Sequence, residues 1–182
     1  MIPHPVPLRA DNPSAAEALT GQLTLTATQR RGLCHPEGYY NQEERKMDCI
    51  FCKIANGEIP SSTLLEDEQV RVILDLGPAA RGHALVLPKE HYKDSTEAPE
   101  ALLGHMMATG ARIGAAQMNA FGCDGFNLIQ NNGESAGQSV FHLHLHVIPR
   151  KTGDDALKLW KPGETTPEEM QETAEMIKAA LK

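Results

Sequence analysis

The most regular alternation of polar and apolar positions lies in residues 139–148, SVFHLHLHVI, where histidine alternates with leucine and valine. Successive side chains of a β-strand point to opposite faces of the sheet, so this pattern predicts a strand with two unlike faces. We expect the leucines and the valine to lie in the core and the imidazoles to be presented outward in a row. The polar face of this strand holds His142, His144 and His146.

Three other segments have the composition of strands. Residues 69–76, QVRVILDL, are rich in β-branched and apolar side chains, and residues 83–87 form a second apolar run that ends at a proline. Turn-forming glycines and a proline lie between these two runs, which predicts an antiparallel meander. Residues 126–130 predict a further strand, separated from the histidine strand by the polar, glycine-containing loop NNGESAG.

Two segments have helical periodicity. Residues 98–120 carry apolar side chains at approximately helical spacing along one long helix, with Pro99 acceptable in its first turn. Residues 166–181, TPEEMQETAEMIKAAL, begin with a threonine cap, a proline and acidic residues that favour the positive end of the helix dipole. A single apolar stripe along this second segment predicts a helix on the surface of the domain.

Residues 1–46 show no sustained period of strand or helix and contain several prolines and scattered charges. We interpret this segment as a disordered N-terminal extension. At Met47 the pattern changes to apolar clusters, turn signals and strand-like runs, so the folded domain is predicted to occupy residues 47–182. Two explanations of the preceding residues are open. Translation could truly start at Met47, or these residues could be a natural disordered tail.

The chain has 182 residues, the size of one ordinary domain, and a net charge of -7. It contains no block of basic residues that could follow a nucleic-acid backbone, so nucleic acid is not an expected partner. No apolar run approaches the roughly 18–20 residues needed to cross a bilayer, and the N-terminus lacks the pattern of a secretory signal. We therefore expect a cytoplasmic protein with no membrane partner, whose cysteines are thiols or metal ligands.

Several chemical roles are open to the histidine row. At a rise of about 3.3 Å per residue, His142 and His146 start roughly 13 Å apart, whereas the ligand atoms of one zinc ion lie about 2 Å from it. We therefore do not expect all three imidazoles to bind one metal. The spacing leaves open an exposed polar strand face, a metal held by two of the histidines, and a division of roles among metal, phosphate and nucleophile.

The run of residues 137–148, GQSVFHLHLHVI, resembles the signature of the histidine triad family, in which three histidines alternate with apolar residues. The match is highly specific because it includes the Gly-Gln-Ser-Val lead-in. The resemblance extends from about Asp48 to Leu181, with CIFCKI near its start, LDL in the second predicted strand and LPKEH before the long helix. It covers nearly all of the chain except residues 1–46.

This resemblance implies an α+β fold with a five-stranded antiparallel sheet, one long helix and a C-terminal helix, paired across a homodimer. It also implies a purine mononucleotide site beside the histidine strand. In the family, the middle histidine attacks the α-phosphorus to form a nucleotidyl-histidine that water then resolves, and the corresponding residue here is His144. A neutral imidazole suits this task because it is abundant near pH 7 and needs no separate base.

Further site residues follow from the same resemblance. His146 and the backbone amide of Val140 would bind phosphate oxygens, while Ser139 would contact the phosphate or the leaving group. A carboxylate at the second predicted strand would accept hydrogen bonds from the ribose hydroxyls, and apolar side chains would enclose the base. The implied nucleotide-binding set is Phe51, Ile54, Ile73, Asp75, Asn131, Gln138, Ser139, Val140, His144 and His146. The neighbouring Asn132 is an alternative to Asn131.

Cys49 and Cys52 are separated by two residues, a spacing that lets two thiolates turn toward one ion. On spacing alone, a redox pair or two unrelated thiols are also open, although no thioredoxin-like βαβ pattern flanks the motif. In the zinc-bearing bacterial branch of the family, such a pair is joined by the histidine of a Pro-Lys-x-His run and by the first histidine of the triad. These correspond to His91 and His142, so the resemblance implies a closed, structural zinc site.

Three functions are compatible with these features. The first is cleavage of a purine nucleoside 5′-phosphoramidate or a related nucleotide linkage, which the Gln-Ser pair before the triad favours. The second is hydrolysis of a dinucleoside polyphosphate, and the third is a zinc-stabilised nucleotide-binding scaffold with incidental hydrolysis. The sequence assigns no role to His83, His105 or Trp160.

Overall fold

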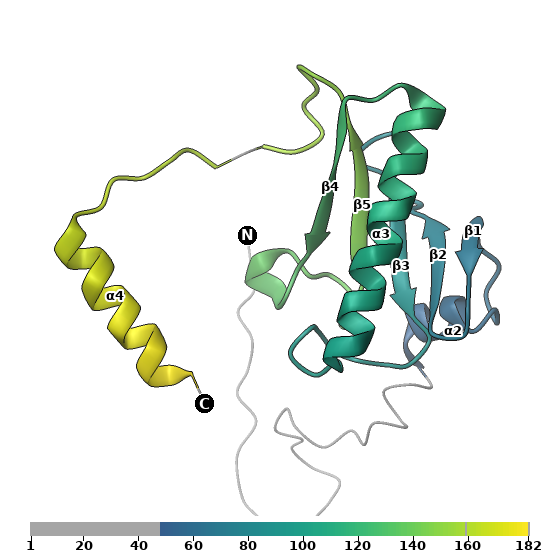
Figure 1. Ribbon diagram of the computed structural model, residues 1–182. Helices are drawn as coiled ribbons and strands as arrows, with labels where there is room; N and C mark the ends of the chain where they lie inside the picture. The colour runs from purple at the N-terminus through teal and green to yellow at the C-terminus, as the bar shows by residue number, and fades with distance from the viewer. Residues whose placement is uncertain (1–47, 159, 182) are drawn as a thin grey trace, which may run out of the picture. The chain divides into compact units, whose positions relative to one another are not determined.

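The computed structural model describes residues 48–158 and 160–181 (Figure 1). The predicted disordered extension, residues 1–46, lies outside these ranges and stays a prediction. The helices and strands of the described residues, in chain order, are α2 (Ile50–Ala55), β1 (Thr63–Glu66), β2 (Val70–Leu74), β3 (Ala84–Pro88), α3 (Glu100–Phe121), β4 (Gly125–Gln130), the 3-10 helix η2 (Glu134–Ala136), β5 (Leu145–Arg150) and α4 (Pro167–Ala180). None of these helices has the length and hydropathy needed to span a bilayer.

The five strands form one antiparallel sheet in the order β1-β2-β3-β5-β4. β1, β2 and β3 are consecutive neighbours, which confirms the meander predicted from the two apolar runs. The chain then crosses through α3, adds β4 at the far edge and returns as β5 between β3 and β4. This topology places His146 of β5 between two strands, with Leu85 of β3 and Ile129 of β4 opposite it.

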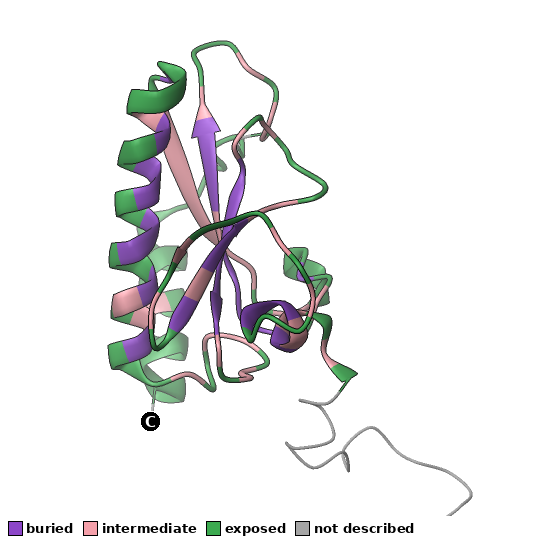
Figure 2. Cartoon of the chain, turned by 90° about the vertical axis from the view of Figure 1, so that its right-hand side faces the viewer, coloured by how far each residue is buried: buried purple, intermediate pink, exposed green. Residues whose placement is uncertain are grey.

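The sheet is covered on both faces, which explains why every residue of β3 is buried. Its alternate side chains enter two separate apolar clusters. Ala84 and Val86 join the cluster under α3, and Leu85 and Leu87 join the cluster under α2. Figure 2 shows the buried residues of α3 along the side that faces the sheet, with α2 beyond the opposite face. A strand buried on both faces reads as a continuous apolar run, as this one does.

α3 lies close to the sheet because glycine occupies two of its contact positions. A Cβ atom added at Gly110 would come within 2.9 Å of Leu145 Cδ2, and one added at Gly114 would come within 2.3 Å of the Phe126 ring. The helix ends where Gly122 adopts a left-handed conformation, with φ of 59°, and its amide bonds to the Met118 carbonyl. Small residues therefore set the distance between α3 and the strands β4 and β5.

α4 forms at the position that its cap predicts. The Thr166 side chain accepts a hydrogen bond from the Glu169 amide, and the Glu169 side chain accepts one from the Thr166 amide, which together make a capping box. No residue of this helix is buried. Its packing on the domain surface therefore stays a prediction.

The histidine strand differs from the sequence-based expectation in two respects. β5 begins at Leu145, whereas residues 139–144 form a turn and an irregular segment in which the His142 amide bonds to the Val140 carbonyl. His142 and His144 are buried and do not form an outward row. The predicted alternation is nevertheless confirmed on its apolar side, because Leu143, Leu145 and Val147 enter the cluster under α3.

The close approach of α3 predicts unequal effects of two glycine substitutions in that helix. Gly114→Ala should lower the free energy of unfolding by about 1–3 kcal/mol, because the new methyl group overlaps the Phe126 ring. Gly104→Ala is the matched control, since no atom lies within 4 Å of the added Cβ. It should be neutral or stabilising by up to about 1 kcal/mol. Equal shifts of the two variants in urea unfolding would contradict this account of the helix packing.

Candidate active site and metal centre

The polar residues of the site lie on the face of the sheet that α2 covers. The apolar cluster on this face comprises residues of α2, β2 and β3 and does not extend over β5. On β5, the same face of the sheet is occupied by His146. His144 lies two residues earlier, just before the strand begins. Asp75 and His83 follow β2 and precede β3, where the Asp75 amide bonds to the His83 carbonyl and extends the ladder. Strand register therefore brings three distant segments together.

Four potential metal ligands converge at the edge of this site. One ligand atom from each of Cys49, Cys52, His91 and His142 lies within 4.8 Å of all the others. The Sγ atoms of Cys49 and Cys52 lie 3.5 and 3.4 Å from His142 Nδ1, and Cys52 Sγ lies 3.3 Å from His91 Nδ1. Because Cys49 immediately precedes α2 and Cys52 lies within it, the first helical turn aims both sulfurs at the same point.

The geometry of this cluster fits tetrahedral zinc. Bonds of about 2.3 Å to sulfur and about 2.0 Å to nitrogen at tetrahedral angles put sulfur and nitrogen about 3.5 Å apart. His142 Nε2 donates a hydrogen bond to the Pro88 carbonyl at 3.0 Å, which leaves the lone pair on Nδ1 facing the thiols. Burial lowers the pKa of His142 to about 4, so this nitrogen is available as a ligand at neutral pH.

His144 is held as a single tautomer by the backbone of its own segment. Its Nδ1 lies 2.6 Å from the His142 carbonyl, and because a carbonyl only accepts, Nδ1 carries the proton. Nε2 therefore bears a lone pair. The Phe51 ring meets the imidazole edge-on, with centroids 5.1 Å apart. Burial also lowers the pKa of His144 against the opposing effects of the His142 carbonyl and Asp75, which favours the neutral, nucleophilic form.

His146 contacts both His144 and His83. Its ring centroid lies 4.9 Å from that of His144, and its Nδ1 lies 2.9 Å from His83 Nε2. Burial is the main cause that lowers the pKa of His146 to about 4, with further lowering by the neighbouring His144 and His83. Burial likewise lowers the pKa of His83. Both rings are therefore neutral at neutral pH.

Asp75 lies beside the histidines at the end of β2. One carboxylate oxygen accepts a hydrogen bond from the Gly77 amide at 2.8 Å, and the other lies 3.6 Å from His83 Nδ1. The Asp75 side chain is about one-fifth exposed, so the carboxylate is accessible from solvent. Its charge favours protonation of both His144 and His146 without outweighing their burial.

The three apolar residues predicted to enclose a base lie together. Ile54 of α2 and Ile73 of β2 are buried in one cluster, and Phe51 packs against it while also contacting the rings of His142 and His144. Phe51 is only half-buried. It is therefore the member of this set with ring surface available next to the histidines.

The two adjacent asparagines before the histidine segment are in different environments. Asn132 Oδ1 accepts hydrogen bonds from the Ser95 amide and hydroxyl at 3.0 and 2.9 Å, so this side chain anchors a neighbouring loop. Asn131 makes one long contact from its Nδ2 to the Gly137 carbonyl at 3.5 Å. Asn131 is thus the residue whose amide is better able to turn to a ligand.

Gln138 is almost fully buried, and its side chain bonds only to the backbone. Its Oε1 accepts from the Gly133 amide at 2.8 Å, and its Nε2 donates to the carbonyls of Lys93 and Val140 at 2.6 and 3.1 Å. The direct contact of Gln138 with nucleotide stays a prediction. These bonds hold the loop in which the amides of Ser139 and Val140 donate no hydrogen bond within the described part of the chain.

His83 is the site residue to which the sequence assigned no role. It lies two residues before Leu85 and four before Leu87, so the period of the strand puts it on the same face as the apolar cluster under α2. This two-residue period is the feature of the sequence from which the position of His83 could have been predicted. His105, by contrast, bonds to Asp67 on the surface at 2.8 Å, and Trp160 is exposed. Neither residue joins the site within the described ranges.

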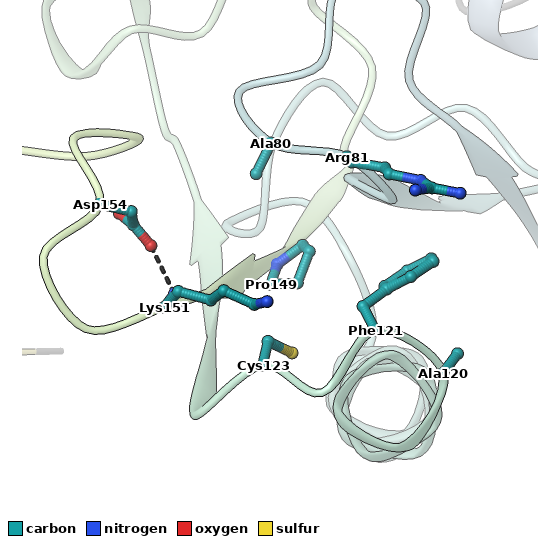
Figure 3. Close-up of a pocket in the computed structure, with 8 residues that line it drawn as sticks. All are labelled: Ala80, Arg81, Ala120, Phe121, Cys123, Pro149, Lys151 and Asp154. Atoms are coloured by element: carbon teal, nitrogen blue, oxygen red, sulfur yellow. Dashed lines mark hydrogen bonds between the residues drawn. The ribbon is translucent and has the colours of Figure 1, made fainter.

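A separate cavity of about 470 Å³ lies near the C-terminal end of α3. Figure 3 shows Arg81 and Phe121 on one side of it and Asp154 on the other. The Arg81 guanidinium lies over the Phe121 ring, 5.6 Å from its centroid. None of the residues that line this cavity belongs to the predicted site.

Comparison with known families agrees with this geometry. Residues 56–153, more than half of the chain, match the HIT domain. The chain belongs to the histidine triad family. Within this family, a HIT-like protein of Methanocaldococcus jannaschii is 42% identical over 130 residues, which is 71% of this chain and 98% of the relative.

Two further relatives carry the names of enzymes. The adenosine 5′-monophosphoramidase of Schizosaccharomyces pombe is 35% identical over 137 residues, covering 75% of this chain and all of the relative. An adenylylsulfatase of Arabidopsis thaliana is 42% identical over 118 residues, which cover 65% of this chain and 60% of that longer protein.

Solved structures of family members share the fold. A protein from Streptococcus mutans superimposes with a TM-score of 0.71 at 38% identity, covering 80% of this chain and 89% of that chain. A zinc-bound histidine triad protein from Mycobacterium smegmatis superimposes with a TM-score of 0.59 at 38% identity, covering 75% and 99%. The five-stranded antiparallel sheet expected from the histidine motif is therefore confirmed.

Proposed function

We propose that this protein hydrolyses a purine nucleoside 5′-phosphoramidate or a related nucleotide linkage through a nucleotidyl-histidine at His144. The observation that carries the proposal is the 2.6 Å hydrogen bond from His144 Nδ1 to the His142 carbonyl. It leaves Nε2 as an unprotonated nucleophile in a buried, neutral ring. The enzyme names of the fungal and plant relatives support the same class of reaction.

The reaction proceeds in two displacements at phosphorus. His144 Nε2 attacks the α-phosphorus, a P–N bond forms to the ring, and the bond to the leaving amine breaks as that amine takes a proton from solvent water. The phosphorylated ring keeps its Nδ1 proton and becomes cationic, a charge that the His142 carbonyl and the Asp75 carboxylate stabilise. Water then attacks the same phosphorus and gives up a proton to solvent. The bond from phosphorus to Nε2 breaks, which releases the mononucleotide and restores neutral His144.

The other site residues bind and orient the substrate. The ring of Phe51 supplies an apolar wall for the base, backed by Ile54 and Ile73. Asp75 accepts hydrogen bonds from the ribose hydroxyls. His146 and the amides at the loop positioned by Gln138 bind phosphate oxygens, on which negative charge accumulates in the transition state. Ser139 and Asn131 contact the phosphate and the leaving group.

Zinc is the metal that we assign to the four-residue cluster. Two cysteines and two histidines form a ligand set typical of zinc, and the zinc-bound family structure supports the assignment. Held by these four residues, the ion would supply rigidity and would leave no position for a reacting water. His142 links this centre to catalysis, because its side chain is a ligand while its carbonyl orients His144.

A homodimer is the assembly that we propose. Among the described residues, β4 is an edge strand that pairs only with β5, and all six of its residues are half-buried. An edge of this kind can pair with the same edge of a second copy.

The zinc assignment predicts different effects for two buried cysteines. Protein purified without chelator should contain about one zinc per chain by elemental analysis. Cys52→Ala should release the metal and lower the melting temperature, because structural zinc contributes directly to folding. Cys123→Ala is the matched control, since Cys123 is also buried but lies outside the cluster. Absence of zinc from the wild type, or equal zinc content in the two variants, would remove the assignment.

The mechanism predicts three different outcomes for the three histidines. His144→Asn should abolish turnover of adenosine 5′-phosphoramidate with nearly unchanged nucleotide affinity, zinc content and melting temperature. His142→Asn should lose zinc and stability. His146→Asn should lower kcat by about 10²-fold, as expected for loss of a transition-state hydrogen-bond donor, and should keep the metal.

The same assays separate the proposed function from its rivals. Wild-type protein should turn over adenosine 5′-phosphoramidate faster than a diadenosine polyphosphate when the two are measured side by side. Faster cleavage of the dinucleotide would assign the polyphosphate activity. Nucleotide binding without turnover of either compound would make the protein a binding module, and substantial turnover by His144→Asn would exclude His144 as the nucleophile.

A further inference from the structure

His83 lies between a backbone amide and the third histidine of the triad. The Ala79 amide is 3.1 Å from His83 Nδ1, and His83 Nε2 is 2.9 Å from His146 Nδ1. His83 is buried, His146 is half-buried, and the centroids of the two rings are 5.1 Å apart. The three groups therefore form a continuous hydrogen-bonded chain that ends on a backbone group.

The polarity of this chain is fixed at its backbone end. A backbone amide can only donate, so His83 Nδ1 must accept and the ring proton lies on Nε2. His83 Nε2 then donates to His146 Nδ1, which leaves the proton of His146 on its own Nε2. We propose that His83 is a positioning residue that fixes His146 as the Nε2–H tautomer and so makes it a hydrogen-bond donor to the phosphate.

This assignment gives the two neighbouring rings of the triad opposite tautomers. His144 bonds to the His142 carbonyl, which is an acceptor. The proton of His144 therefore lies on Nδ1 and its lone pair on Nε2. The chain from His146 ends on the Ala79 amide, a donor, which puts its lone pair on Nδ1 and its proton on Nε2. One ring is thereby a nucleophile and the other a donor, although they lie two residues apart.

The competing arrangement is a protonated His83 paired with Asp75. The Asp75 carboxylate oxygen is 3.6 Å from His83 Nδ1, beyond hydrogen-bonding distance, whereas the Ala79 amide is within it. A proton on Nδ1 would also oppose the amide hydrogen. Burial lowers the pKa of His83 more than Asp75 raises it, and the neighbouring His144 adds to the lowering. Neutral His83 is therefore the form that its surroundings favour.

The Ala79 amide is itself held in place. It immediately precedes a tight turn, residues 80–83, in which the His83 amide bonds to the Ala80 carbonyl at 3.0 Å. Gln117 of α3 donates to the Gly82 carbonyl at 2.8 Å, and a Cβ added at Gly82 would meet the Phe121 ring at 2.3 Å. The turn is thus anchored to the long helix, so the backbone end of the hydrogen-bonded chain is held rigidly.

Two substitutions of similar size test this hydrogen-bonded chain from Ala79 through His83 to His146 in the full-length protein. In His83→Gln, the amide oxygen can accept from Ala79 while the amide nitrogen donates to His146, so the Nε2–H tautomer should persist and kcat should stay within about 10-fold of wild type. In His83→Glu, a carboxylate oxygen replaces the donor, so the His146 proton should move to Nδ1. The kcat for adenosine 5′-phosphoramidate should then fall by about 10²-fold or more.

Long-range ¹H–¹⁵N correlation spectra of the histidine rings give a readout that does not depend on turnover. We expect wild type and His83→Gln to show the His146 proton on Nε2, and His83→Glu to show it on Nδ1. An unchanged His146 tautomer in His83→Glu, or a wild-type His146 with its proton on Nδ1, would overturn the proposal. The inference about donor function rests on the proposed hydrolysis, but these spectra remain decisive even if no nucleotide substrate is turned over.

Discussion

His142 uses three of its polar atoms to connect parts of the molecule that are far apart in the sequence. Its Nδ1 faces the thiols of Cys49 and Cys52, its Nε2 donates to the Pro88 carbonyl, and its own carbonyl accepts from His144. The side chain is completely buried, so each of these bonds replaces one that water would otherwise make. The position and tautomer of the proposed nucleophile therefore depend on the same residue that belongs to the metal cluster.

The sheet makes this arrangement possible by having two unlike faces. Alternate residues of β3 and β5 fill the apolar cluster under α3, and this packing fixes the strands. On the opposite face the apolar cluster ends at β3, and the neighbouring strand β5 carries His146 there. Burial beside that cluster lowers the pKa values of these histidines and favours their neutral forms. One hydrophobic layer thus supports the strands, and the other lowers the pKa values of the histidine rings.

Much of this could be predicted from the sequence, and the rest depended on non-local contacts. The two-residue period identified the apolar face of residues 143, 145 and 147, and the family signature identified the cluster of cysteines and histidines. The burial of His144 could not be seen, because it depends on Phe51, which is distant in the chain. The roles of His83 and Gln138 were also hidden, because each depends on which backbone group lies opposite a side-chain atom.

The central claim is that His144 forms a covalent bond to the nucleotide. The most direct test is to mix the protein with excess adenosine 5′-phosphoramidate, quench within the first turnover and identify the modified residue by mass spectrometry under conditions that preserve phosphorus–nitrogen bonds. The account predicts one adenylyl group per active site, attached to His144 and absent from His144→Asn. A label on another residue, or product formation without any covalent adduct, would contradict it.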